Sequence, residues 1–229
     1  MISTPAIVLH TTPYGETSVI VKVFTRMLGV RSYIIKGVRG RNARVKQNLL
    51  QPLSCLDMVV YDNSKTDLNY VKELSSRGAC FEASPAENAL RFFMTEVLYK
   101  SLQEAEPMPA LYDYVEAAGA NLAPSTASIP VSFLLTVSYH LGIEPLDNCC
   151  SAEPLFDLQE GRFVSAPSET TLSPTISALL HEYLSSSTLR PAPLSDRRSL
   201  IDALLAYYQL HLSNFRHFTS HEILHTVLK

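Results

Sequence analysis

The spacing of apolar residues changes near residue 80, and this change constrains the fold of the 229-residue chain more than any other feature. Before it, apolar and polar side chains alternate, which is typical of β-strands with one buried face. The alternating segments are rich in Val, Ile, Tyr and Thr, and they cover residues 6–12, 17–25, 30–36, 52–61 and 68–73. Five short strands predict a small barrel, because closure removes exposed strand edges.

The second part of the chain has helical spacing. Ser84, Pro85 and Glu87 combine an N-cap serine, a proline at the first helical position and a glutamate at the third, which together predict a helix start. Further helices are predicted over residues 110–121, 130–141, 174–185, 196–212 and 220–228. Residues 155–158 and 162–164 flank a Gln-Glu-Gly turn and predict a β-hairpin between two of these helices.

These patterns predict an α+β fold with two domains. Residues 1–80 form the small β-barrel, and residues 81–229 form an all-α helical domain with a short β-hairpin insertion at about 150–166. We place the boundary within residues 75–83.

Charge is divided between the two parts. Residues 1–80 carry a net charge of +6 and residues 81–229 a net charge of −9, although the whole chain carries only −3. Residues 17–56 contain no Asp or Glu, but they hold eight cations: Lys22, Arg26, Arg31, Lys36, Arg39, Arg41, Arg44 and Lys46. An ordinary soluble surface intersperses both signs, so this stretch predicts a part that binds a polyanion.

Two segments of the acid-free stretch suggest separate roles. A turn over residues 26–29 would pair Lys22 with Tyr33 in a hairpin, and one face would then carry Lys22, Phe24, Arg26, Arg31 and Tyr33. Such a mixture of cations and rings suits single-stranded nucleic acid, since charge follows the backbone and rings stack on bases. Residues 36–46 contain two glycines and five cations, and they predict a basic loop that orders on phosphates; the alternative is a solvated charged loop.

Residues 221–225 (HEILH) match the H-E-x-x-H pattern of zinc hydrolases, which places His221 and His225 on one helix face with Glu222 as general base. Such sites need a third protein ligand, usually downstream, and only four residues follow His225. A capping box, with Thr219 as N-cap and Glu222 at the third helical position, also accounts for these residues. A zinc-dependent hydrolase is therefore the less favoured alternative.

The compartment is inferred from what the sequence lacks. The first 21 residues have no basic segment before an apolar run, and no stretch is apolar enough to span a bilayer. The cysteines Cys55, Cys80, Cys149 and Cys150 form no disulfide framework. We expect a reduced cytoplasmic protein with no membrane partner.

Several segments resemble the RecO family of bacterial DNA repair and recombination proteins. They are residues 7–18 (IVLHTTPYGETS), 23–26 (VFTR), 35–40 (IKGVRG), 50–53 (LQPL) and 218–224 (FTSHEIL). The resemblance implies an N-terminal OB-fold and a helical domain, in a DNA-binding protein that is not an enzyme. It also implies binding of single- and double-stranded DNA, annealing of complementary strands, and loading of RecA on coated strands.

The resemblance further implies two protein partners, RecR and the acidic C-terminal tail of single-stranded DNA-binding protein. The DNA-binding residues that the resemblance implies are those of the family's basic loop, which corresponds to Lys36, Arg39, Arg41 and Arg44. Four further candidates come from the predicted strand face, namely Lys22, Arg26, Arg31 and Tyr33, and Lys46 is added because it belongs to the same run of cations. The same cations would serve an RNA-binding OB-fold protein, which stays an alternative. A scaffold that self-associates through its divided charge is another.

The chain departs from the family at a metal site. Many RecO proteins carry two cysteine pairs around a hairpin in the helical half, but this chain has only the adjacent Cys149 and Cys150 there. Adjacent cysteines lack the spacing of structural zinc sites. We therefore predict no metal and no cofactor, with the hairpin held by apolar packing of Leu155, Phe156 and Phe163.

Overall fold

The computed structural model describes residues 1–38, 47–61, 68–78, 84–102, 106–122, 128–185 and 192–227. By internal contact the chain forms two compact units, Met1–Ala123 and Pro124–Lys229. The first two helices thus group with the strands, whereas the predicted boundary near residue 80 lies where strands give way to helices.

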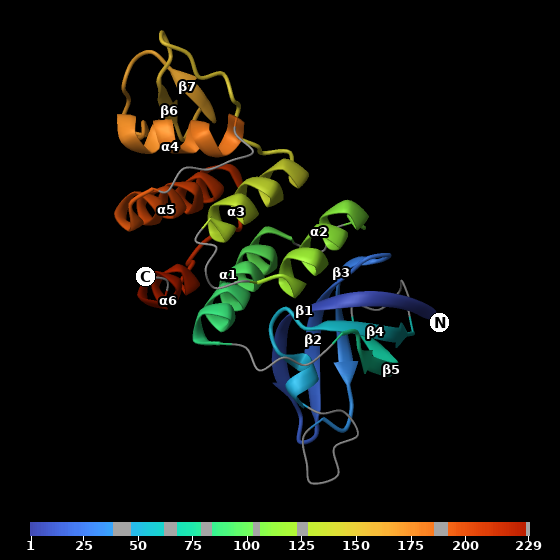
Figure 1. The fold of residues 1–229 in the computed structure, drawn as a ribbon. Coiled ribbons are helices and arrows are strands. Elements are labelled where there is room, and N and C mark those ends of the chain that lie inside the picture. The colour runs from blue at the N-terminus through green and yellow to red at the C-terminus, as the bar shows by residue number, and fades with distance from the viewer. Residues whose placement is uncertain are drawn as a thin grey trace. The chain divides into compact units, whose positions relative to one another are not determined.

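The first unit contains a closed five-stranded barrel (Figure 1). Its strands are β1 (Ile2–Tyr14), β2 (Ser18–Thr25), β3 (Gly29–Ile35), β4 (Cys55–Val60) and β5 (Asn69–Ser76), joined in the order β1-β2-β3-β5-β4. A short 3-10 helix, η1 (Gln47–Leu50), precedes β4. All five predicted strands are confirmed, as is the OB-like barrel; among the described strands of the barrel, β3 and β5 pair in parallel and the other pairs are antiparallel. Val8, Val21, Tyr33 and Met58 are among the residues that fill the interior.

The predicted register of the β2–β3 hairpin is wrong by one residue. Thr25 pairs with Gly29, Lys22 with Ser32 and Val21 with Tyr33. The turn has three residues rather than four, because the Thr25 hydroxyl accepts from the Leu28 amide at 2.9 Å and donates to the Gly29 carbonyl at 2.8 Å. Gly29 has φ 70°, a conformation that glycine adopts without strain. Lys22 therefore lies on the face of the hairpin opposite to Tyr33.

Helices α1 (Pro85–Ser101) and α2 (Pro109–Ala120) belong to the same unit. The predicted capping box starts α1: the Glu87 amide donates to the Ser84 hydroxyl at 3.2 Å, and the Ser84 amide donates to the Glu87 carboxylate at 2.6 Å. Phe24 on β2 is buried, with its ring centroid 5.6 Å from that of Tyr112 on α2. The outer face of β2 is thus partly covered by helix.

The second unit is helical. It contains α3 (Ile129–His140), α4 (Pro174–Ser185), α5 (Leu194–His211) and α6 (Ser220–Val227), with the strands β6 (Leu155–Asp157) and β7 (Arg162–Val164) between α3 and α4. Tyr208 joins α5 to α3 by donating to the Leu134 carbonyl at 2.6 Å. Figure 1 shows the β6–β7 hairpin beside α4. The helical class and the hairpin insertion are both confirmed.

The hairpin is held by rings and by two polar side chains. Phe156 and Phe163 are buried with centroids 5.2 Å apart, as predicted, whereas Leu155 is only half-buried. Asn148 binds the backbone of Phe163 twice, accepting from its amide at 2.8 Å and donating to its carbonyl at 2.9 Å. No pattern in the sequence predicts this contact of the Asn148 amide.

Asp157 is the second polar anchor. Burial alone would raise the pKa of its carboxyl, but donors from Ser168, Thr170 and the amides of Gln159 and Glu160 lower the pKa to about 2. A buried carboxylate of this kind is stabilised because each oxygen accepts several hydrogen bonds. Asp157 thereby connects the hairpin to residues 168–171, which precede α4.

Candidate nucleic-acid interface

The acid-free stretch forms the middle of the barrel. It includes β2, β3 and η1, and it ends inside β4. Lys22, Arg26, Arg31 and Lys36 lie among the described residues, whereas Arg39, Arg41, Arg44 and Lys46 lie outside them. The structure therefore reports on four of the eight predicted cations.

Each of these four cations contacts another group of the protein. Lys22 lies with Nζ 4.8 Å from the centroid of the Tyr99 ring on α1. Arg26 forms a bidentate ion pair with Asp113 on α2, with Nε 2.7 Å from Oδ1 and Nη2 2.9 Å from Oδ2. Arg31 donates to the carbonyl of Val30 at 2.9 Å.

The Arg26–Asp113 pair affects the charge that β2 offers to a ligand. The hydrogen bond and charge of Arg26 hold the pKa of Asp113 below its usual range, so this carboxylate stays ionised near neutral pH. Both side chains are about half exposed. A phosphate that bound Arg26 would have to compete with Asp113.

Lys36 has a different neighbour. It is exposed at the end of β3, and its Nζ lies 4.5 Å from the centroid of the Tyr70 ring on β5. The parallel register of β3 and β5, which pairs Ile34 with Tyr70, creates this proximity. Tyr70 is 44% exposed, and the amide of Tyr61, a second exposed tyrosine, donates to the Tyr70 carbonyl at 3.1 Å. A cation and aromatic rings therefore do share the barrel surface, although not where the sequence placed them.

Tyr33 was predicted on the same face as the cations, but it is 1% exposed and belongs to the barrel core. A ring in this position is not accessible for stacking on a base. The shift of one residue in the hairpin register explains the difference, because it moves Tyr33 to the interior face. Tyr70 is the accessible ring that sequence reasoning missed, and its signal was an aromatic residue in the alternating segment 68–73.

The His221–Glu222–His225 motif lies on α6. The ring centroids of the two histidines are 5.7 Å apart, and His225 Nε2 is 3.6 Å from an Asp202 oxygen. Burial lowers the pKa of His225, which favours the neutral ring. Within the described ranges no group of three or more His, Cys, Asp or Glu side chains could hold a metal ion. In the same residues no helix is both long and apolar enough to cross a membrane.

Comparison with known proteins gives consistent matches over almost the whole chain. Residues 1–78 match the family model described as Recombination protein O N terminal, and residues 84–220 match Recombination protein O C terminal. The chain is 30% identical to a DNA repair protein RecO of Porphyromonas gingivalis, with 97% of each chain covered. It is 27% identical to that of Christiangramia forsetii, with 99% of each covered, and 28% identical to that of Flavobacterium johnsoniae, with 97% of each covered.

Proposed function

Because the chain belongs to the RecO family of DNA repair proteins, a family of mediators rather than enzymes, we propose that it is a DNA-binding recombination mediator. In this role it binds single- and double-stranded DNA, anneals complementary strands and, with RecR, helps to load RecA on strands coated by single-stranded DNA-binding protein. The site of action is the cytoplasm, at the nucleoid during repair.

This proposal rests mainly on the acid-free stretch, residues 17–56, and on its position in the barrel. Forty residues with eight cations and no carboxylate include two adjacent strands of a closed OB-like barrel. Lys36, at the end of β3, adds an exposed cation beside the ring of Tyr70. A positive groove with aromatic platforms is the arrangement by which such barrels hold single strands.

The proposed DNA-binding residues are revised by the contacts. We retain Lys36 and the cations Arg39, Arg41, Arg44 and Lys46, and we replace the buried Tyr33 by Tyr70. Arg31 is half-buried on the same strand face as Tyr33 and contributes at a lower level. Arg26 contributes at a lower level because Asp113 already binds it, and Lys22 does so because it is half-buried beside Tyr99, whereas Lys36 is exposed. Residues 1–80 thus form the DNA-binding part, and residues 81–229 carry the net negative charge.

Annealing follows from charge neutralisation. Two complementary strands repel each other through their phosphates, and cations that bind those phosphates release counterions and lower the repulsion. Stacking on Tyr70 is sequence-tolerant, because every base has an aromatic face. The proposed partners are RecR and the acidic C-terminal tail of single-stranded DNA-binding protein.

The test is a titration of labelled single-stranded DNA at several salt concentrations. Four to six phosphate contacts give a log–log slope of about −3 to −4, and changing Arg39, Arg41 and Arg44 to Glu should weaken binding and reduce the slope by about 2. A control changes Arg162, Arg190 and Arg216 to Glu, which alters the net charge equally but in the acidic half. Equal losses in the two triple variants would remove residues 39–44 from the site.

The RNA-binding alternative uses the same cations. A competition between DNA and RNA oligonucleotides of matched sequence separates the two, since the 2′-hydroxyl is the group by which a protein distinguishes them. Preferential displacement by RNA would replace the DNA proposal.

A further inference from the structure

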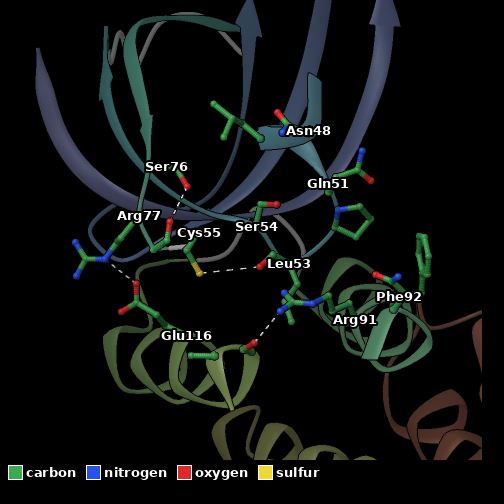
Figure 2. Close-up of a pocket in the computed structure, with 16 residues that line it drawn as sticks. Asn48, Gln51, Leu53, Ser54, Cys55, Ser76, Arg77, Arg91, Phe92 and Glu116 are labelled. Atoms are coloured by element: carbon green, nitrogen blue, oxygen red, sulfur yellow. Dashed lines mark hydrogen bonds and ion pairs between the residues drawn. The ribbon is translucent and has the colours of Figure 1, made fainter. Parts of the chain in front are cut away.

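A cavity of about 570 Å³ lies within the first unit, between the segment that precedes β4 and the helices α1 and α2 (Figure 2). Its volume is in the range of small-molecule sites. Among the described residues, none of the cations assigned above to phosphate binding lines it. Asn48, the first described residue of its wall, lies two positions after Lys46 in the sequence.

The walls combine amides with an aromatic ring. Figure 2 shows Asn48 and Gln51 on the barrel side of the cavity, with Arg91 and Phe92 of α1 opposite. Asn48, Gln51 and Asn88 are exposed, and each amide offers both a donor and an acceptor. Phe92 is 48% exposed, although its ring would be expected inside a core.

The charge in the cavity comes from Arg91. Its Nη2 donates to the Gly119 carbonyl at 3.2 Å, so among the described residues a neutral carbonyl holds the guanidinium in place. The other arginine of the wall, Arg77, is bound by the carboxylates of Asp57 and Glu116 at 3.0 and 2.8 Å. Among the described residues of the wall, Arg91 is therefore the arginine that is not held in a close ion pair, although, beyond the hydrogen bonds from Ser84, its charge also helps to lower the pKa of Glu87.

The floor is held in a strained conformation. Leu53 is buried with φ 61°, in the left-handed region that residues with a Cβ rarely adopt. Its amide donates to the Val8 carbonyl at 2.9 Å, and a Cβ added at Gly119 would lie 3.1 Å from its Cδ2. Strain of this kind persists where surrounding contacts enforce it, and it is concentrated at ligand sites.

We propose that this cavity takes one unstacked nucleobase of a bound single strand, with Phe92 stacking on the base and the three amides contacting its edges. The proposal rests on the DNA-binding function above. Amide side chains pair with base edges, and aromatic and guanidinium planes stack on splayed bases, so the donor set fits this ligand. Because a base in a duplex would first have to leave its stack, the cavity favours single over double strands.

The test compares an intact oligonucleotide with an abasic strand of the same length, by fluorescence anisotropy with the full chain. Each stacked base should make the intact strand bind roughly 5- to 150-fold more tightly, and Phe92 and Tyr70 each provide one stacking ring. Phe92→Ala should remove only the part of this difference that Phe92 provides, a loss of roughly 5- to 150-fold for the intact strand, while binding the abasic strand like the unchanged protein. Its salt slope should stay the same, since no phosphate contact is removed.

Two further variants keep the test specific. Ala120→Phe adds a ring at an exposed position of the wall, and it should block the cavity and reduce the base-dependent difference as much as Phe92→Ala does. Tyr139→Ala removes a ring that is 62% exposed in the second unit, and it should leave the difference intact. Circular dichroism of each variant verifies the fold.

The outcomes separate the two proposals. If the unchanged protein binds neither strand in a salt-dependent way, the DNA-binding function fails and the cavity proposal fails with it. If both strands bind but Phe92→Ala weakens them equally, or Ala120→Phe binds like the unchanged protein, the cavity serves another ligand, such as a partner peptide, and the nucleobase proposal is wrong. If Tyr70→Ala alone removes the whole base-dependent difference, the nucleobase proposal is likewise wrong.

Discussion

The Nζ atom of Lys36 lies 4.5 Å from the centroid of the Tyr70 ring, and both side chains are exposed at the surface of the barrel. A cation over a ring face is attracted by the ring quadrupole, and the ring remains available on its other face. This pair places an exposed cation and an exposed aromatic ring side by side.

The two members of the pair should have separable effects on DNA binding. Tyr70→Ala should weaken binding of single-stranded DNA by roughly 5- to 150-fold with little change in salt slope, because it removes stacking. Lys36→Ala should reduce the slope by about 0.7, because it removes one phosphate contact. Anisotropy titrations at several salt concentrations measure both quantities. Tyr70→Phe is the matched control and should bind like the unchanged protein.

The ion pair between Arg26 and Asp113 should restrain DNA binding. Asp113→Asn releases Arg26 for a phosphate, so affinity for single-stranded DNA should rise at low salt and the slope should steepen by about 0.7. Asp147→Asn, in the second unit, changes the net charge equally and should have little effect on the slope. A gain of the same size in both variants would mean that net charge alone is responsible.

The strands, the helices and the OB-like barrel were predictable because their signals are local. Alternation, the Ser84–Glu87 capping box and turn residues each depend on a few neighbouring positions. The hairpin register was not predictable, because the Thr25 hydroxyl and the Gly29 conformation shorten the turn by one residue. That single residue moves Tyr33 into the core.

The missed parts of the candidate site depend on distant segments. Lys36 meets Tyr70 only because β3 pairs in parallel with a strand more than thirty residues later. The cavity joins residues near Gln51, Arg91 and Gly119, and no periodic pattern relates them. Charge composition indicated the kind of ligand, but it could not identify which rings and amides would meet it.

The pKa of Asp157 predicts an acid-sensitive hairpin. Its carboxyl has a lowered pKa of about 2 in the folded protein, so its stabilising effect is complete above the unfolded value near 4 and is lost as pH falls toward 2. Asp157→Asn should therefore flatten the pH dependence of unfolding free energy between pH 4 and 2. Denaturant titrations across this window measure the effect. An unchanged pH profile would contradict the assigned role.

Asp157→Ala should also destabilise the protein at neutral pH, by about 1–3 kcal/mol, because several donors lose their acceptor. Glu160→Ala is a suitable control at a neighbouring exposed position, where the ion pair with Arg162 is about half exposed. Surface pairs of this kind contribute little, so the control should unfold close to the unchanged protein.

Gly161 and Gly142 allow a comparison of the stability lost when a Cβ is added close to another side chain with that lost when it is added in open space. Both have φ near 70°, but a Cβ at Gly161 would lie 2.9 Å from the Tyr207 hydroxyl, whereas a Cβ at Gly142 meets nothing within 4 Å. Gly142→Ala should cost about 1–2 kcal/mol from backbone strain alone, and Gly161→Ala should cost more, because Tyr207 must also move.

Moving Tyr207 would break its bond to the Ile143 carbonyl, which has a length of 2.9 Å. Gly161→Ala combined with Tyr207→Phe should therefore be less destabilised than the sum of the two single changes, because the clash is with the hydroxyl that the second change removes. Thermal and denaturant unfolding of the four variants measure this coupling. Strictly additive losses would show that the backbone at Gly161, and not its approach to Tyr207, sets the cost.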